Sequence, residues 1–183
     1  MLPLALSLTN KRVLVLGAGK VAASKIALVL EQGANITVIS PEVLVSLPES
    51  VHYEARRYTP GDLEGFHLVI SATGVPEVND LVVAEANARG IWLNVVDDPG
   101  RCDFFFTAVH REGPVTVSVS SEGSAPALAQ YLRDHVRATL PRGVASVAKS
   151  LRTERDAMHE SGVSTESISW RARIEELFAA EGN

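Results

Sequence analysis

The sequence has one cysteine, Cys102, among its 183 residues, so no disulfide can form within the chain. Its five histidines are scattered, and no spacing of cysteine and histidine matches a zinc site. We therefore predict no metal site. We also predict that Cys102 is a small buried apolar residue rather than a catalytic thiol, because no neighbouring residue supplies a base for it.

Long apolar runs and an excess of positive charge are also missing. No apolar stretch approaches the roughly 20 residues that a membrane-spanning helix needs, and the amino terminus lacks the pattern of a signal peptide. A formal net charge of -5 argues against nucleic acid as the main partner, because that binding depends on clustered lysine and arginine. With 46% hydrophobic and 21% charged residues, the chain is predicted to be a cytoplasmic globular protein of one or two domains.

A glycine motif near the start of the chain is its most informative stretch. An apolar run at 12–16 leads into Gly17, Gly19 and Ala22, which match the dinucleotide-binding pattern G-x-G-x-x-[G/A]. In that pattern the first glycine permits a tight turn, the second lets a pyrophosphate approach the backbone, and the small third residue lets helix and strand pack closely. The helix expected at 21–32 presents free N–H groups and a partial positive charge to an anion. The alternative is a unit that uses its glycines only for packing.

The second expected strand, 36–39, ends where the usual fingerprint places an acid that binds the ribose hydroxyls. Ser40 occupies this position, and Glu42 follows two residues later. Either Glu42 reaches the ribose from the loop, or Ser40 tolerates the 2′-phosphate of NADP; we favour NAD. The predicted cofactor-binding residues are Gly17, Gly19, Lys20, Val21, Ala22, Ser40, Pro41, Glu42 and Thr73.

Strands and helices alternate through about residue 96, which predicts an α/β fold with a Rossmann-type, doubly wound parallel sheet. The leucines of residues 1–10 alternate as either a short edge strand or an arm would. The other expected elements are strands at 52–55, 67–73 and 91–96, a brief helix after a turn at 58–63, and a longer helix at 79–89.

The pattern changes after Cys102. Two β-rich runs separated by a glycine turn predict a hairpin, and Ser124 is placed to cap the helix that follows a loop rich in glycine and serine. The last segment is helical in composition with one interruption, which predicts two helices. In chain order these elements are strands at 104–109 and 114–119, the loop at 120–126, the helix at 126–140 and the tail at 141–183, interrupted near 161–162.

Four stretches of the chain are informative in combination. They are the glycine turn at 17–22, the strand end Ser71-Ala72-Thr73, the run Asn94-Val95-Val96-Asp97-Asp98-Pro99 with Cys102 and Phe104 behind it, and the loop Ser120-Ser121-Glu122-Gly123-Ser124-Ala125-Pro126. Together they resemble the precorrin-2 dehydrogenase / sirohydrochlorin ferrochelatase family of sirohaem synthesis. The resemblance spans about residues 4–140 and fades in the tail.

The resemblance implies an NAD-binding Rossmann domain at 1–106, a small α+β dimerisation domain at 107–140 and a helical region at 141–183, in a homodimer. It implies NAD-dependent oxidation of precorrin-2, a tetrapyrrole, to sirohydrochlorin. The catalytic residue of the family is the aspartate that ends the Asn-Val-Val-Asp strand, which is Asp97 here. No methyltransferase domain follows, so the chain resembles the stand-alone form rather than the fused synthase.

Chemical reasoning agrees with a role for Asp97. Precorrin-2 loses a hydride and a proton; the cofactor accepts the hydride, and one carboxylate near the nicotinamide suffices for the proton. The alternative is a turn or helix-cap residue before Pro99, which is the reading we prefer for Asp98. A substrate ringed by carboxylates also needs cations. The predicted substrate-binding residues are Ser120, Ser121, Ser124 and Arg101, with Arg111 and Lys25 as further candidate cations.

Other functions stay open at this point. Insertion of Fe²⁺ is a candidate second activity, with Asp97 as the base that removes pyrrole protons. The main alternative is an NAD-binding regulatory or sensor module without catalysis, which would usually carry an acid in place of Ser40 and has no use for Asp97. A Rossmann reductase acting on another small substrate fits the first 96 residues but does not explain the rest.

Overall fold

The structure is a computed structural model that describes residues 2–166 and 168–181. Residues 1, 167, 182 and 183, which belong to the predicted amino-terminal arm and helical tail, lie outside the described residues. The chain divides into two compact units, Met1–Phe105 and Phe106–Asn183, which are described one after the other. Among the described residues, no helix combines the length and the apolar character that crossing a bilayer requires.

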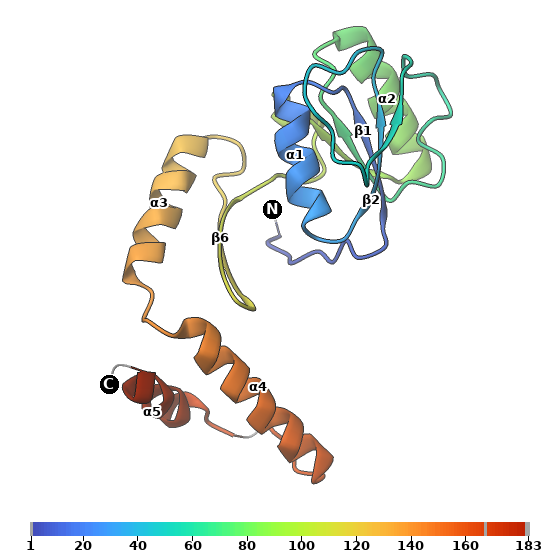
Figure 1. Ribbon diagram of the computed structural model, residues 1–183. Coiled ribbons are helices and arrows are strands. Elements are labelled where there is room, and N and C mark those ends of the chain that lie inside the picture. The colour runs from blue at the N-terminus through green and yellow to red at the C-terminus, as the bar shows by residue number, and fades with distance from the viewer. Residues whose placement is uncertain (1, 167, 182–183) are drawn as a thin grey trace. The chain divides into compact units, whose positions relative to one another are not determined.

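A five-stranded parallel sheet forms the centre of the first unit (Figure 1). Its spatial order is β3-β2-β1-β4-β5, so the chain builds outward from β1 in both directions, which confirms the predicted doubly wound sheet. Helix α1 (Lys20–Leu30) and helix α2 (Pro76–Arg89) lie on opposite sides of this sheet in Figure 1. The strands are β1 (Arg12–Leu16), β2 (Asn35–Ile39), β3 (His52–Glu54), β4 (Leu68–Ser71) and β5 (Trp92–Val95).

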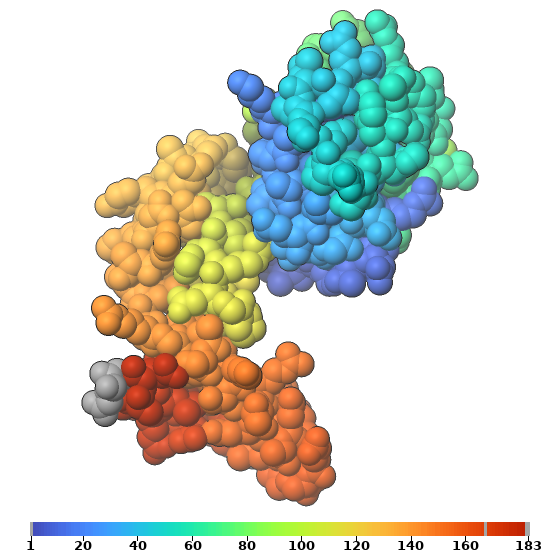
Figure 2. Space-filling view, in the orientation of Figure 1, coloured from blue at the N-terminus to red at the C-terminus, as the bar shows by residue number. Residues whose placement is uncertain are grey.

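The centre of the core is β1, whose residues Val13, Leu14, Val15 and Leu16 are fully buried. A strand with neighbours on both sides and helices on both faces has no solvent-facing side, which explains why its sequence is a continuous apolar run rather than an alternating one. On the face of the first unit that Figure 2 presents, most of the surface belongs to α1 and to the loops that follow β2 and β3.

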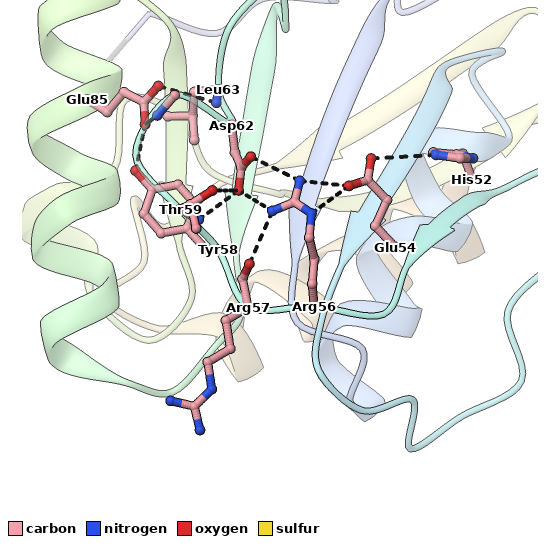
Figure 3. A network of polar contacts seen from close by, with 10 residues as sticks. His52, Glu54, Arg56, Arg57, Tyr58, Thr59, Asp62, Leu63 and Glu85 are labelled. Carbon is pink, nitrogen blue, oxygen red and sulfur yellow. Dashed lines mark hydrogen bonds and ion pairs between the residues drawn. The ribbon is translucent and has the colours of Figure 1, made fainter.

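One local expectation differs from the structure, and one open alternative is decided. The predicted turn at 58–63 is present, but the brief helix expected after it is absent before β4. Residues 2–8 form no strand, so of the two alternatives for the leucines near the amino terminus the structure has the arm. A polar network explains the absence of the helix (Figure 3). Glu85 on α2 accepts hydrogen bonds from the Tyr58 hydroxyl (2.6 Å) and from the backbone N–H of Gly61 (2.9 Å) and Leu63 (3.3 Å). Backbone donors that bind a side chain in this way are not available to a helix.

The same network holds the chain that leaves β3. The Arg56 guanidinium lies between Glu54 (2.7 Å) and Asp62 (2.6 Å), while the Arg57 side chain points away from the network (Figure 3). Hydrogen bonds to Asp62 raise the pKa of Arg56, which keeps it charged. The loop between β3 and β4 is therefore fixed by paired side chains in addition to the backbone hydrogen bonds of its turns.

The second unit begins with an antiparallel hairpin of β6 (Ala108–Glu112) and β7 (Val115–Val119), which turns at Gly113 with a φ of +58°. The hairpin was predicted, but Phe104, Phe105 and Phe106 precede it rather than belong to its first strand. Three helices follow, and the two that form the tail confirm the predicted interruption. They are α3 (Pro126–Thr139), α4 (Val144–Glu160) and α5 (Arg171–Glu181).

The prediction that Ser124 caps α3 is wrong. The N-cap residue is Ala125, and no described side chain caps this helix. The Ser124 hydroxyl donates instead to the backbone carbonyl of Ser121 (2.5 Å), while the Ser121 hydroxyl accepts from the N–H of Ala125 (3.1 Å). These bonds close the loop before the helix begins.

Candidate active site

Gly17 opens the turn between β1 and α1, and its surroundings explain why the residue is a glycine. It has a φ of +100°, and a Cβ atom placed on it would lie 2.5 Å from the carbonyl oxygen of Ala72, just past β4. Its N–H donates to the carbonyl of Ile39 at the end of β2 (2.9 Å). Gly17 is therefore required by packing: the turn fits between the ends of two neighbouring strands only without a side chain.

Gly19 differs from Gly17. Within the described part of the chain, no heavy atom lies within 4 Å of the position that its Cβ would take, and its φ of -91° suits any residue. Gly19 is the N-cap of α1, and the buried Ala22 of the first turn lets that helix approach the sheet. Neither packing nor backbone strain requires a glycine here. An open position at a helix N-terminus fits the pyrophosphate of a dinucleotide, which needs backbone N–H groups and free space.

The loop after β2 is fastened to this turn. The Leu44 N–H donates to the carbonyl of Ala18 (3.0 Å), and the Tyr53 hydroxyl donates to the carbonyl of Ser40 (2.8 Å). Ser40 is buried, and its hydroxyl donates to the backbone carbonyl of Glu42 (2.7 Å). The Ser40 proton is thus engaged within the loop, and the exposed acid beside the glycine turn is Glu42.

Thr73 follows β4 and belongs to a small polar cluster. Its hydroxyl donates to the Asn79 side-chain oxygen (3.1 Å) and accepts from the N–H of Val75 (3.2 Å), and the hydroxyl of buried Ser71 also donates to Asn79 (2.7 Å). Asn79 was missed in the sequence. Its signal was there, since it shares one buried helical face with Val82 and Ala86 and is the polar member of that face. Asn79 therefore orients Ser71 and Thr73 at the carboxyl edge of the sheet.

Asp97 lies two residues beyond β5, at the same edge of the sheet. Strand pairing continues just past the strand, with the Val96 N–H donating to the carbonyl of Ser71 (2.9 Å), and then stops. Asp97 is exposed and has a φ of +63°, a left-handed conformation that aspartate tolerates better than most residues. The strand end thus turns sharply and presents a carboxylate to solvent.

Lys25 lies within electrostatic reach of Asp97. It is half-buried and shares the sheet-facing stripe of α1 with Ala22, Ile26 and Val29, which are all buried. Burial lowers the pKa of Lys25, and the negative charge of Asp97 opposes that change. Of the three cations considered from the sequence, Lys25 is the one whose charge is coupled to the candidate catalytic carboxylate.

The other two cations are placed differently. The Arg101 guanidinium donates to Asp98 (2.6 Å) and to Asp80 of α2 (2.5 Å), and these hydrogen bonds raise the pKa of Arg101. Arg111 is exposed on β6 of the second unit. Asp98 and Asp80 thus both hold the Arg101 guanidinium.

Cys102 lies against the backbone of β5. Its thiol lies 3.2 Å from the carbonyl of Val95 and 3.3 Å from the N–H of the same residue. Burial raises the pKa of this thiol, so the nucleophilic thiolate is disfavoured. Beside it, the Asn94 amide donates to the carbonyl of Phe104 (2.9 Å). Cys102 and Asn94 both fasten the segment after β5, which agrees with the reading of Cys102 as a packing residue.

The three predicted substrate serines belong to the second unit, in the loop between β7 and α3. The Ser120 hydroxyl accepts from the N–H of Glu122 (3.1 Å), a residue with a φ of +50°. Together with the bonds of Ser121 and Ser124 already described, this makes a tight turn held by hydroxyl groups. Among the described residues, no group of three or more histidine, cysteine, aspartate or glutamate side chains could hold a metal ion.

Comparison with known families agrees with this arrangement. A family model described as "Putative NAD(P)-binding" matches residues 4–108, more than half of the chain, and one described as "Sirohaem biosynthesis protein central" matches residues 112–139. The chain therefore belongs to the family described as "Putative NAD(P)-binding". The resemblance predicted from the sequence is thereby confirmed, and so is a dinucleotide cofactor.

Individual relatives of this family extend the comparison. "Siroheme synthase" of Tolumonas auensis is 42% identical over 150 residues, which cover 80% of this chain and 32% of the relative. "Siroheme synthase 2" of Aeromonas salmonicida is 38% identical over 186 residues, which cover 98% of this chain and 38% of the relative. The chain thus spans about a third of the length of the curated relatives it matches. The solved structure of "SirC, precorrin-2 dehydrogenase" has the same fold, with a TM-score of 0.71 at 22% identity over 98% of this chain and 88% of that one.

Proposed function

We propose that the protein is an NAD-dependent dehydrogenase that oxidises precorrin-2 to sirohydrochlorin in sirohaem synthesis. The observation that carries this proposal is Asp97, an exposed carboxylate in a left-handed turn at the sheet edge of an NAD(P)-binding family member. A sensor module needs the glycine turn but has no need of a carboxylate held in an unfavourable backbone conformation.

The first unit supplies the cofactor site. The N–H groups of Lys20 and Val21, at the start of α1, bind the pyrophosphate in the space that Gly19 leaves open. Pro41 and Glu42 flank the adenosine ribose, and the Glu42 carboxylate favours NAD over NADP because it would repel a 2′-phosphate. When bound, NAD supplies the acceptor for the substrate hydride.

Asp97 accepts the proton that leaves the substrate. Its position past the end of β5 is on the edge where ligands of doubly wound sheets bind. Lys25, whose charge interacts with that of Asp97, is the cation nearest to this step. The hydroxyls of Ser120, Ser121 and Ser124 are proposed to bind substrate carboxylates, as the position of this loop in the family suggests.

The protein is further proposed to be a homodimer. The apolar side chains of Leu128, Tyr131 and Leu132 stand on α3 with exposed fractions of 53%, 68% and 40%, at the three- and four-residue spacing that defines one helix face. In Figure 2 this helix forms an outer surface of its unit, in orange. A two-stranded hairpin and one helix bury little by themselves, so a second copy is the partner that would cover this face. We also propose the predicted division of roles, with NAD bound by residues 1–106, dimerisation through 107–140 and a helical region at 141–183; the last two ranges belong to one compact unit.

The test is incubation of the purified protein with precorrin-2 and NAD while the absorption spectrum is followed. We expect the sirohydrochlorin spectrum to appear together with NADH, and a much lower rate with NADP. Tight NAD binding without turnover would favour the sensor module instead. Adding Fe²⁺ after oxidation is complete tests the candidate second activity, because iron insertion changes the spectrum again. The cytoplasmic location stays a prediction.

A further inference from the structure

The segment that carries Asp97 is tied to two different elements. On one side it is fastened to its own strand: the Asp98 N–H donates to the carbonyl of Val95 (3.2 Å), and the Asp103 carboxylate accepts from the N–H of Leu93 (2.9 Å). On the other side the Arg101 guanidinium bridges Asp98, at 2.6 Å from Nε, and Asp80 on α2, at 2.5 Å from Nη1. One arginine therefore connects the loop after β5 with the helix before it.

We propose that Arg101 is a positioning residue for Asp97, with Asp80 as its anchor on α2. This inference rests on the proposed function, in which Asp97 is the catalytic carboxylate. It differs from the expectation that Arg101 binds a substrate carboxylate, because its Nε and one terminal nitrogen already donate to protein carboxylates.

Two features of the loop make positioning useful. Asp97 is exposed and has a φ of +63°, so no packing of its own side chain fixes its direction. Its direction is set by the backbone of residues 97–101, which includes the short 3₁₀ turn Pro99–Arg101. A guanidinium held by two carboxylates has a fixed plane, and this limits how far the loop can rotate away from α2.

The bridge is expected to act on turnover more than on stability. The Asp80 side chain is 70% exposed and that of Arg101 is 32% exposed, and ion pairs of this kind add little to the free energy of unfolding. A reacting group displaced by about 1 Å, in contrast, can lose up to roughly 10²-fold in rate. Removal of the bridge should thus lower kcat while leaving the melting temperature and NAD affinity nearly unchanged.

A double-mutant cycle on the full chain tests this proposal. For Arg101→Ala and for Asp80→Ala we expect kcat for precorrin-2 to fall about tenfold while KM changes less than about twofold. The double variant should be no slower than Arg101→Ala alone, because both changes break the same bridge. Arg101→Lys should recover part of the rate. The matched control is Glu64→Ala, which removes the exposed Glu64–Arg89 pair (3.8 Å) in the same unit and should leave kcat unchanged.

The two readings of Arg101 predict different results for Asp80. If Arg101 bound the substrate, Arg101→Ala would raise KM, and Asp80→Ala would leave or lower KM because it removes a competing carboxylate; that pattern overturns the proposal. Additive losses in the double variant, or a wild-type kcat for Asp80→Ala, overturn it as well. Asp97→Asn is measured in the same series. If Asp97→Asn turns over normally, the catalytic assignment itself fails, whereas a slow Asp97→Asn beside a normal Asp80→Ala rejects the positioning role alone.

Discussion

The two units differ in how completely each buries its own apolar surface. In the first unit, Val13 to Leu16 of β1 are fully buried, and the neighbouring strands β2 and β4 contribute further buried residues on both sides. In the second unit, the buried apolar side chains among the described residues are Ala129, Val144 and Val147, while Leu128 and Tyr131 of α3 stand more than half exposed. The first unit thus has a complete core, and the second has an apolar face that still needs a cover.

The two units also differ in how far their paired carboxylates are buried. Glu85 of the first unit is 11% exposed and accepts hydrogen bonds from three residues of the loop at 58–63. Glu154 of the second unit is 30% exposed and accepts hydrogen bonds from the Arg173 guanidinium of α5. We infer that the first unit is stabilised by its own interior, and that the second gains much of its stability from assembly.

Placing charges on the exposed apolar face of α3 should have the largest effect, on the dissociation of the proposed dimer. Replacing Leu128 and Tyr131 with aspartate places two charges in the proposed dimer interface, and we expect the dissociation constant to rise by roughly 10³-fold, or about 4 kcal/mol. Sedimentation velocity at micromolar concentration would then show a monomer. The first unit offers a matched control, since Leu81 on α2 is also 50% exposed. Leu81→Asp should leave the dimer intact, and a wild-type protein that sediments as a monomer would contradict the proposed interface.

Two glycines of the turn after β1, Gly17 and Gly19, allow the requirements of folding and of NAD binding to be tested separately. Gly17→Ala places a Cβ 2.5 Å from the Ala72 carbonyl in a backbone conformation that disfavours alanine, so we expect a loss of about 3 kcal/mol in the free energy of unfolding. Gly19→Ala meets no described atom and should leave that free energy unchanged while weakening NAD binding. Denaturant titration and NAD titration of both variants check this pair. Unaltered NAD affinity in Gly19→Ala and in the bulkier Gly19→Val would show that the phosphate does not bind there.

The sequence predicted the first unit better than the second, for a physical reason. Apolar strands, glycine turns and helical spacing are local patterns, and they gave the parallel sheet and the turn at Gly17 and Gly19 directly. A brief helix was wrongly expected after the turn at 58–63, because the decisive partner of this loop, Glu85, is more than 20 residues away in the sequence. Similarly, serine is a common helix cap, but the Ser124 hydroxyl donates to the carbonyl of Ser121 instead.

The candidate site shows the same limit. Asp97 could be found because a strand end and a family motif coincide at that position. The bridge from Arg101 to Asp80 could not be found, because it joins residues 21 positions apart whose types are common on any surface. From its residue type alone, Arg101 was predicted to bind the substrate. The structure shows that its guanidinium is already hydrogen-bonded to Asp98 and Asp80.

Asp97→Asn tests the catalytic role in the first unit. Asparagine also tolerates the left-handed conformation, so this change removes the charge and leaves the backbone unstrained. We expect kcat to fall about 10²-fold or more, the usual scale for loss of a positioned acid or base, with NAD affinity kept. Glu49→Gln, an exposed carboxylate of the same unit, is the control and should keep the wild-type rate. Equal rates for the two variants would mean that Asp97 serves only the turn.

The smallest expected effect concerns the carboxylates compared above, Glu85 of the first unit and Glu154 of the second. Burial by itself raises the pKa of Glu85, but hydrogen bonds from Tyr58, Gly61, Leu63 and Arg89 hold it below its ordinary value of 4.5. A carboxyl whose pKa is lower in the folded state stabilises the fold above its unfolded pKa, and this contribution is lost as the pH falls through the folded value. Glu85→Gln should therefore lower the free energy of unfolding by about 2 kcal/mol at pH 7, measured by denaturant titration, and the difference from wild type should shrink below about pH 4.5.

The control is Glu154→Gln in the second unit. Hydrogen bonds from Arg173 also lower the pKa of Glu154, but this pair lies at the surface, so the free energy of unfolding should stay unchanged within error. Equal losses for the two variants would show that the second unit is as self-sufficient as the first.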